Sequence, residues 1–240
     1  MNVNDNDAAN LQLSPEEMRL VSDPGWILTK NSIVGKVVGM LAGLGERYGM
    51  IWEEGFAGGK EGFVVGEEGL RAGGNDVKGG KISKGENYKG LPYVILDYPR
   101  LFGKEDVLAI RTMFWWGHAF MTTLHLKGCY RALYLPVIRE RWGELAAAGF
   151  YIGISEDEWR HEHVPENYRP MGDAGRFEDG DRPKGDGWLP EDGERPFLKL
   201  SARCGLDRWG EAPMILEGHF RVLVDVLSRV SDCRGKPGTK

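Results

Sequence analysis

Three consecutive stretches of apolar, β-branched and aromatic residues in the middle of the chain constrain its fold more than any other feature. They cover residues 91–98, 107–115 and 118–126, and short connections separate them. Runs of this length and composition are typical of strands, and short connections favour antiparallel neighbours. The sequence therefore predicts an antiparallel sheet built around these segments. A helix over 104–115 is the alternative, because Val107, Ile110 and Phe114 also fit a period of 3.6.

The second and third segments are expected to form a hairpin with Trp116 and Gly117 at its tip. A loop of two or four residues places Phe114 opposite Ala119 and Arg111 opposite Thr122. Arg111 then shares its sheet face with seven apolar side chains: Val107, Ala109, Met113, Trp115, Phe120, Leu124 and Leu126.

Helical patterns flank this sheet on both sides along the chain. Ser14, Pro15 and Glu17 form a helix start with a capping box. Further helices are predicted over 32–52, 136–148, 155–159 and 213–230, with short strands over 150–154 and 197–202. The order predicts one α+β domain over residues 1–240, with an antiparallel sheet of four to five strands packed by helices on one or both sides.

Glycine is unusually abundant, with 35 residues among 240. It is concentrated near 55–80 and 171–193, which are predicted to be flexible loops. Gly35, Gly39 and Gly43 lie four residues apart and so share one face of the predicted helix over 32–52. That face indicates either a seam for helix dimerisation or close packing against the protein's own sheet, and the second interpretation is preferred.

Charge and cysteine content limit the compartment and the partners. The net charge is −5, which disfavours non-specific nucleic-acid binding, and three unpaired cysteines favour a reducing, cytoplasmic environment. The N-terminus lacks the pattern of a secretory signal, and the most apolar stretch, Ile33–Gly45, is too short to span a membrane. We expect a monomer or homodimer that binds neither membranes nor nucleic acids.

Arg111 is the sharpest candidate for a ligand contact. A guanidinium on an apolar sheet face requires an acceptor, and Asp97 and Glu86 are plausible partners. Arg111 is either half of an internal ion pair or the base of a pocket that holds a ligand carboxylate or phosphate.

A polar cluster over residues 81–89 precedes the first apolar strand and is either a turn or part of the same site. An exposed tryptophan at the hairpin tip would also mark a contact. The predicted ligand-binding residues are Lys84, Glu86, Asn87, Tyr88, Asp97, Arg111, Trp116 and His118. This hypothesis describes a binding module for a small anionic ligand or a protein partner, without a cofactor.

The alternative is a metal-assisted or acid–base enzyme. His161 and His163 point the same way in an extended segment and, with Glu158, could hold a divalent ion or transfer protons. His118 with Asp97 is a second acid–base pair. H-x-H alone is a weak signal, so a charged loop is the preferred interpretation of 161–163.

The phrases GENYKGLPYVILDYP and RTMFWWG, within residues 81–117, resemble a family of small uncharacterised bacterial α+β proteins. The resemblance implies a bacterial, cytoplasmic, single-domain protein. It implies no activity for any residue.

Overall fold

The computed structural model describes residues 11–56, 80–172 and 195–230. The glycine-rich segments predicted to be loops lie almost entirely outside the described residues. The chain divides into two compact units, residues 1–39 and 40–240, which we describe separately.

The first unit contains helix α2 (Pro15–Ser22) and the start of helix α3 (Pro24–Phe56). The predicted capping box of α2 is confirmed. Ser14 Oγ accepts a hydrogen bond from Glu17 N at 3.2 Å, and Glu17 Oε2 accepts one from Ser14 N at 2.7 Å. These two bonds satisfy main-chain donors that a helix start otherwise leaves open.

Helix α3 is longer than predicted, with 33 residues. By length and composition alone it could cross a membrane, because an 18-residue window has a mean hydropathy of 1.3 and is only 17% buried. The expectation that the apolar stretch is too short to span therefore fails for this helix. The cytoplasmic location stays a prediction.

The interpretation of Gly35 and Gly39 as residues that pack against the sheet stays a prediction, because they belong to the first unit and the sheet to the second. A Cβ added to Gly35 or Gly39 would meet no atom within 4 Å, so neither packs closely against another described part of the first unit. Two α3 glycines of the second unit lie against strand residues, with the built Cβ of Gly45 3.5 Å from Leu96 and that of Gly49 3.7 Å from the Tyr98 hydroxyl.

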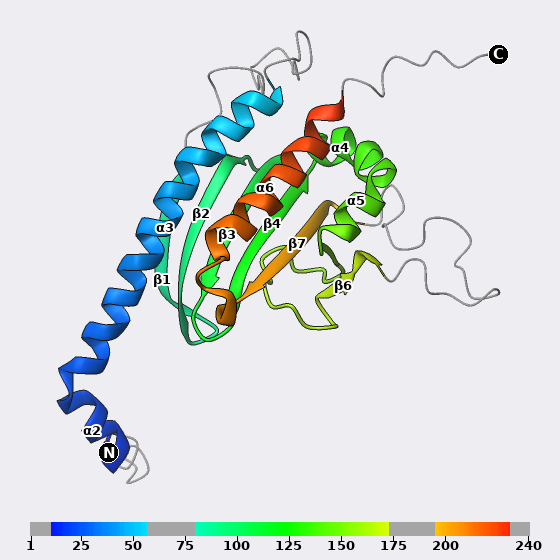
Figure 1. The fold of residues 1–240 in the computed structure, drawn as a ribbon. Coiled ribbons are helices and arrows are strands. Elements are labelled where there is room, and N and C mark those ends of the chain that lie inside the picture. The colour runs from blue at the N-terminus through cyan, green and yellow to red at the C-terminus, as the bar shows by residue number, and fades with distance from the viewer. Residues whose placement is uncertain (1–10, 57–79, 173–194, 231–240) are drawn as a thin grey trace, which may run out of the picture. The chain divides into compact units, whose positions relative to one another are not determined.

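The second unit is built on one antiparallel sheet of seven strands, which confirms the α+β class and shows that four to five strands was an undercount. Its spatial order is β1-β2-β3-β4-β7-β5-β6 (Figure 1). The strands are β1 (Lys81–Tyr88), β2 (Leu91–Phe102), β3 (Val107–Trp115), β4 (Ala119–Lys127), β5 (Tyr151–Gly153), β6 (Tyr168–Pro170) and β7 (Phe197–Gly205). The polar cluster at 81–89 is thus mainly an edge strand, and the helical alternative over 104–115 is wrong.

The β3–β4 hairpin forms as predicted, but its register differs by one residue. The connection has three residues, Trp116–His118, with Gly117 at φ +73°, and Trp115 pairs with Ala119. Arg111 consequently lies opposite Thr123 rather than Thr122. Because side chains alternate between faces, this shift places Thr123 and His125 on the face of Arg111 and moves Phe120, Leu124 and Leu126 to the other face.

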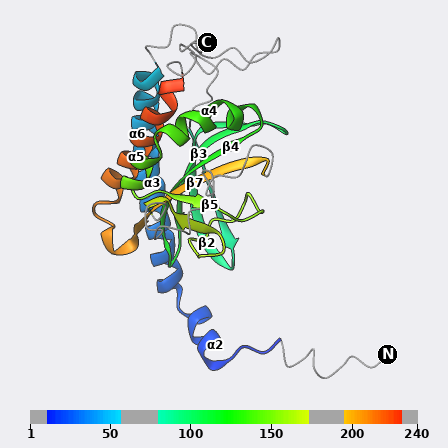
Figure 2. The same cartoon turned by 90° about the vertical axis from the view of Figure 1, so that its right-hand side faces the viewer.

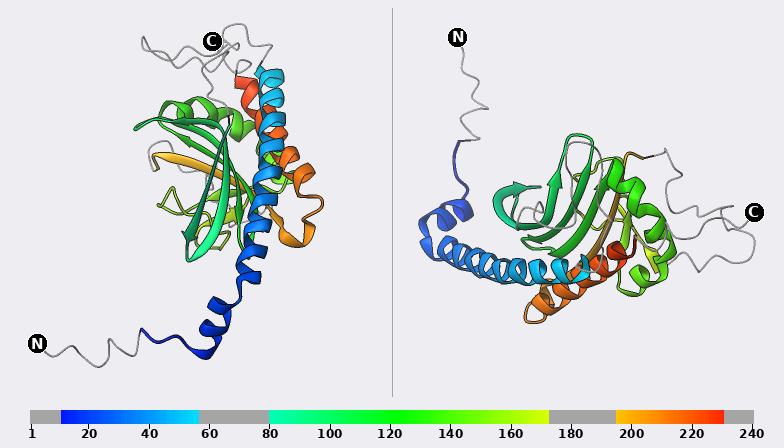
Figure 3. Two further views of the ribbon diagram at one scale, coloured as in Figure 1. Left: turned by 90° about the vertical axis from the view of Figure 1, so that its left-hand side faces the viewer. Right: turned by 90° about the horizontal axis from the view of Figure 1, so that it is seen from above.

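The opposite face of the sheet packs against helix α6 (Ala212–Ser228) and against α3 residues of the same unit. Tyr48 stacks on Phe220 with ring centroids 3.8 Å apart and donates a hydrogen bond to Leu216 O. Its hydroxyl also lies 3.2 Å from Thr112 Oγ1. Turned views show α6 against one face of the sheet only (Figures 2 and 3).

Two helix predictions need correction. The helix expected over 136–148 is two helices, α4 (Cys129–Glu140) and α5 (Trp142–Ala147), so Pro136 lies inside a helix. Helix α4 begins earlier because Gly128 turns the chain at φ +59° and Asp106 Oδ1 accepts from Cys129 N at 2.7 Å. No helix forms over 155–159, where Ser155 and Asp157 side chains accept main-chain hydrogen bonds in turns instead.

Gly128→Ala should lower the free energy of unfolding by at least about 2 kcal/mol. The added Cβ would lie 2.5 Å from Glu105 O, and the positive φ is unfavourable for alanine. Gly143→Ala in α5 is the matched control, since its Cβ would meet nothing, and it should be neutral or stabilising. Urea unfolding measures both. Equal effects of the two substitutions would contradict the role given to Gly128.

Candidate functional site beneath the segment 154–167

Polar side chains form two adjacent rows across the sheet face that is turned away from α6. Cross-strand pairing aligns Asp97, Arg111, Thr123 and Ser201 in one row. His125 and Lys199 pair in the next. We call these six residues the polar belt. An apolar cluster borders it along the strands and contains Ile95, Met113, Trp115, Ala119 and Met121.

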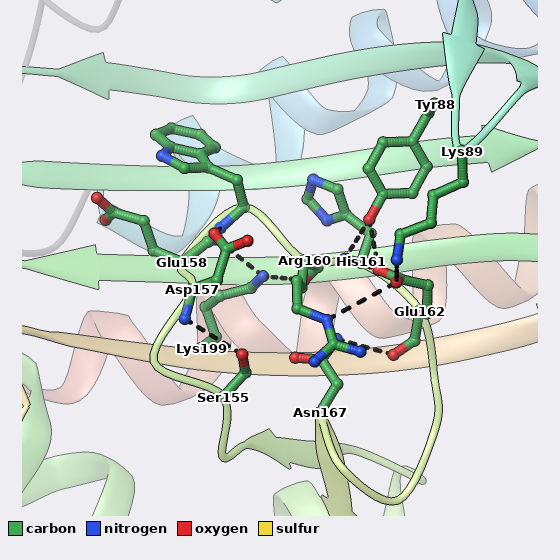
Figure 4. A network of polar contacts seen from close by, with 11 residues as sticks. Tyr88, Lys89, Ser155, Asp157, Glu158, Arg160, His161, Glu162, Asn167 and Lys199 are labelled. Carbon is green, nitrogen blue, oxygen red and sulfur yellow. Dashed lines mark hydrogen bonds and ion pairs between the residues drawn. The ribbon is translucent and has the colours of Figure 1, made fainter.

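The segment 154–167, which connects β5 to β6, covers the polar belt. Figure 4 shows it in front of the strands, with the helices behind them. Lys199 reaches up from β7 and donates to Glu158 O at 2.9 Å and to Arg160 O. The buried ammonium of Lys199 is thus satisfied by main-chain carbonyls of the covering segment.

Arg111 is held by Asp97 in bidentate geometry. Its Nε and Nη2 donate to the two carboxylate oxygens at 2.7 and 3.0 Å. Nη1 lies 3.4 Å from His161 Nε2, and the guanidinium carbon lies 5.9 Å from both the Phe102 and the Trp159 ring centroids. The cation is therefore oriented by one carboxylate and enclosed by two aromatic rings.

Glu158 connects the segment to the second row of the belt. Its Oε2 lies 3.0 Å from His125 Nε2, and its Oε1 accepts from Lys127 Nζ at 3.1 Å. Thr123 and Ser201 hydroxyls lie 3.0 Å apart, and Ser201 Oγ lies 2.9 Å from His163 Nε2. Both rows of the polar belt therefore contact side chains of the segment 154–167, through His163 for the first row and Glu158 for the second.

The far end of the segment is tied to the β1–β2 turn. The Tyr88 hydroxyl donates to Glu162 Oε2 at 2.5 Å and accepts from His161 N at 2.8 Å. Lys89 Nζ lies 2.6 Å from Glu162 Oε1. Burial would raise the pKa of Glu162, but hydrogen bonds from Lys89 and Tyr88 lower it to about 2, so the carboxylate stays ionised.

Burial and neighbouring cations change the protonation of the groups at the site. Burial, with Lys199 and Arg111 nearby, lowers the pKa of His161 well below its usual value, and burial lowers that of His125 to about 4 against the opposing effect of Glu158. Burial and Arg111 lower the pKa of Lys199 to about 8. At neutral pH the two imidazoles are neutral, whereas Lys199 remains mostly protonated.

A small cavity of about 10 Å³ lies between the belt and the segment. This volume accommodates about one water molecule. Its walls combine ionisable and aromatic side chains: Phe102, Ala109, Arg111, Thr123, His125, Glu158, Trp159, His161 and Lys199.

The structure brings together only part of the predicted site. Asp97 is the partner of Arg111, and Tyr88 reaches the segment above it. Lys84, Glu86 and Asn87 are exposed on β1, and Asn87 Oδ1 accepts from Gly90 N within the turn. Trp116 and His118 lie at the hairpin tip, where His118 stacks on Trp115 at 3.5 Å. These five residues do not line the cavity.

Sequence reasoning missed Thr123, His125, Lys199, Ser201 and Trp159. A hairpin register with a three-residue connection would have placed Thr123 and His125 beside Arg111. No local pattern indicates Lys199 or Ser201, because their strand pairs with β4 across about 70 intervening residues.

The metal alternative gains no support from the geometry. The His161 ring is turned to Arg111 and the His163 ring to Ser201. Across residues 11–56, 80–172 and 195–230, no group of three or more His, Cys, Asp or Glu side chains could hold a metal ion.

Comparisons with known proteins add no assignment, since no family model, curated protein or solved structure matches the chain. The resemblance to bacterial α+β proteins therefore stays a prediction.

His125, the histidine of the polar belt, should make stability depend on acid pH. His125 has a lower pKa in the folded chain than the usual value near 6.5, so the unfolded chain binds more protons between about pH 6.5 and 4. Stability should therefore fall as the pH falls through this window. His125→Gln should reduce that slope by up to about 1.4 kcal/mol per pH unit.

The measurement is urea unfolding at a series of pH values. His118→Gln serves as the control, because His118 is exposed at the hairpin tip, and it should keep the wild-type slope. A His125→Gln slope equal to that of the wild type would contradict the assignment of a buried, neutral His125.

Proposed function

We propose that the second unit binds a small organic anion through a carboxylate, in the space between the polar belt and the segment 154–167. The orientation of Arg111 supports this proposal most directly. Asp97 occupies the Nε–Nη2 edge of the guanidinium, so a ligand carboxylate would bind at the Nη1–Nη2 edge, where His161 Nε2 now lies 3.4 Å from Nη1. The flanking Phe102 and Trp159 rings suit the hydrocarbon part of such a ligand.

The charge balance of the site also favours an anion. Arg111 and Lys199 line the cavity against one carboxylate, that of Glu158. Their paired neighbours, Asp97 and Lys127, add one charge of each sign. With the histidines neutral, one positive charge remains uncompensated, and one carboxylate of a bound ligand would neutralise it.

Binding requires the segment to move, because the closed cavity holds about one water molecule. The bonds between main-chain groups of residues 155–163 stay within the segment, as from Arg160 N to Asp157 O and from Val164 N to Glu162 O. Its connections to the sheet involve side chains, as where Lys199 donates to the Glu158 and Arg160 carbonyls and Tyr88 bonds to His161 N and Glu162. Rotation of these few side chains would admit a ligand without disturbing a strand.

The acid–base enzyme remains a second candidate, supported by the lowered pKa of Lys199 beside two neutral imidazoles. His163 takes no part in it, since its ring lines a separate surface cleft. His118 and Asp97 do not form the alternative pair, because His118 stacks at the hairpin tip. We prefer anion binding, because it uses the observed orientation of Arg111 by Asp97 and requires no reaction.

Thermal unfolding with succinate tests the proposal, against sodium chloride at equal ionic strength and with phosphate as a second arm. Succinate at about ten times its Kd should stabilise the wild type by about 1.4 kcal/mol, or several degrees in Tm. Arg111→Met should abolish the shift. Arg203→Met is the matched control, because Arg203 lies on the same sheet face but is exposed and outside the cavity.

If Arg111→Met does not fold, Trp159→Ala provides a second test of the proposed site. This side chain is 49% exposed, so its truncation should leave the fold intact while weakening the succinate shift. A wild-type chain that succinate does not stabilise would contradict the proposal. A shift with phosphate alone would reassign the ligand class.

A further inference from the structure

Exposed apolar side chains are concentrated in the first unit. Among the described residues, eleven large hydrophobic side chains are exposed, and seven of these lie between residues 11 and 28. Helix α2 has no buried residue at all. The seven are Leu11, Leu13, Met18, Val21, Trp26, Ile27 and Leu28. Such a concentration marks an interaction surface rather than ordinary scatter.

One face of α3 within this unit is suited to a neighbouring helix. Leu28, Ser32, Gly35 and Gly39 follow one another at spacings of four, three and four residues, so they share a face, and all are exposed. Val37 is buried and lies on the opposite side of the helix. The open space at Gly35 and Gly39 would let another helix approach closely.

The connection between the two helices is well defined. Asp23 Oδ1 accepts from Gly25 N at 2.8 Å, and Trp26 Nε1 donates to Leu20 O at 3.1 Å. The first unit therefore presents α2 and the start of α3 in a fixed mutual arrangement, which lowers the entropic cost of association.

The charges of the first unit are self-complementary. Residues 14–23 carry Glu16, Glu17 and Asp23 against one arginine, whereas residues 24–39 carry Lys30 and Lys36 and no acidic residue. In a two-fold antiparallel arrangement, the acidic part of one copy meets the basic part of the other. A single mixed-charge patch of this kind fits its own copy.

We propose that residues 11–39 form a homodimer interface in which the Leu28–Gly39 face of α3 packs against the first unit of a second copy. This goes beyond the anion-binding proposal and does not depend on it. A bilayer is the less suitable occupant, because the polar run Thr29–Ser32 and Lys36 lie within the proposed Leu28–Gly39 interface and would be costly in hydrocarbon.

Sedimentation equilibrium over a wide concentration range tests the interface on the full chain. The wild type should show a monomer–dimer equilibrium that weakens with salt, and Leu28→Glu should raise its dissociation constant at least about tenfold. Met214→Glu is the matched control, since Met214 is a similarly exposed apolar residue on α6, and it should leave the equilibrium unchanged.

Three results would overturn the proposal. The first is a wild type that stays monomeric at the highest concentration. The second is a dimer that Leu28→Glu does not weaken. The third is flotation of the wild type with anionic phospholipid vesicles that Leu28→Glu abolishes, which would assign this face to a membrane surface.

Discussion

The ion pair between Arg111 and Asp97 is the interaction on which the sheet face beneath the segment 154–167 depends. Both residues lie in the middle of strands whose neighbouring positions are apolar, so each would be costly to bury without the other. Their bidentate bond fixes the guanidinium plane, and that plane sets where His161, Phe102 and Trp159 can lie. Replacing both by apolar residues would be compatible with a stable sheet. The proposed anion site would account for their presence.

The composition of the polar belt also depends on the length of the β3–β4 connection. With three residues at the β3–β4 connection, Thr123 and His125 join the row of Arg111 and meet Ser201 and Lys199 of β7. A two- or four-residue turn would have placed Phe120 and Leu124 there instead, and the face would be an apolar core. The polar character of this face thus depends on the turn at Gly117, which lies outside the cavity.

Much of the fold can be predicted where the determinants are local. The Ser14 capping box, the strand from Val107 to Trp115 and the amphipathic pattern of α6 all depend on residues within a few positions of one another. Strand β1 is polar because it lies at the sheet edge, and β6 has three residues, so neither shows a strand pattern. The start of α4 depends on Asp106, which is distant in sequence from the helix interior.

The same contrast between local and long-range determinants applies to the residues of the candidate site. Arg111 and Asp97 stand out because a lone cation among apolar residues requires a partner, and that partner lies on the adjacent strand. Lys199 and Glu158 become part of the site only through the pairing of β4 with β7 and the path of the segment 154–167. Lys84 and Asn87, although equally polar in sequence, face solvent because β1 is an edge strand.

Hydrogen–deuterium exchange of the peptide covering residues 155–167, with and without saturating succinate, tests the central claim most directly. If the segment closes over an anion held by Arg111, exchange in this peptide should slow on binding in the wild type and remain unchanged in Arg111→Met. Unchanged exchange in the wild type, or equal slowing in both proteins, would show that the belt and its cover serve the fold alone.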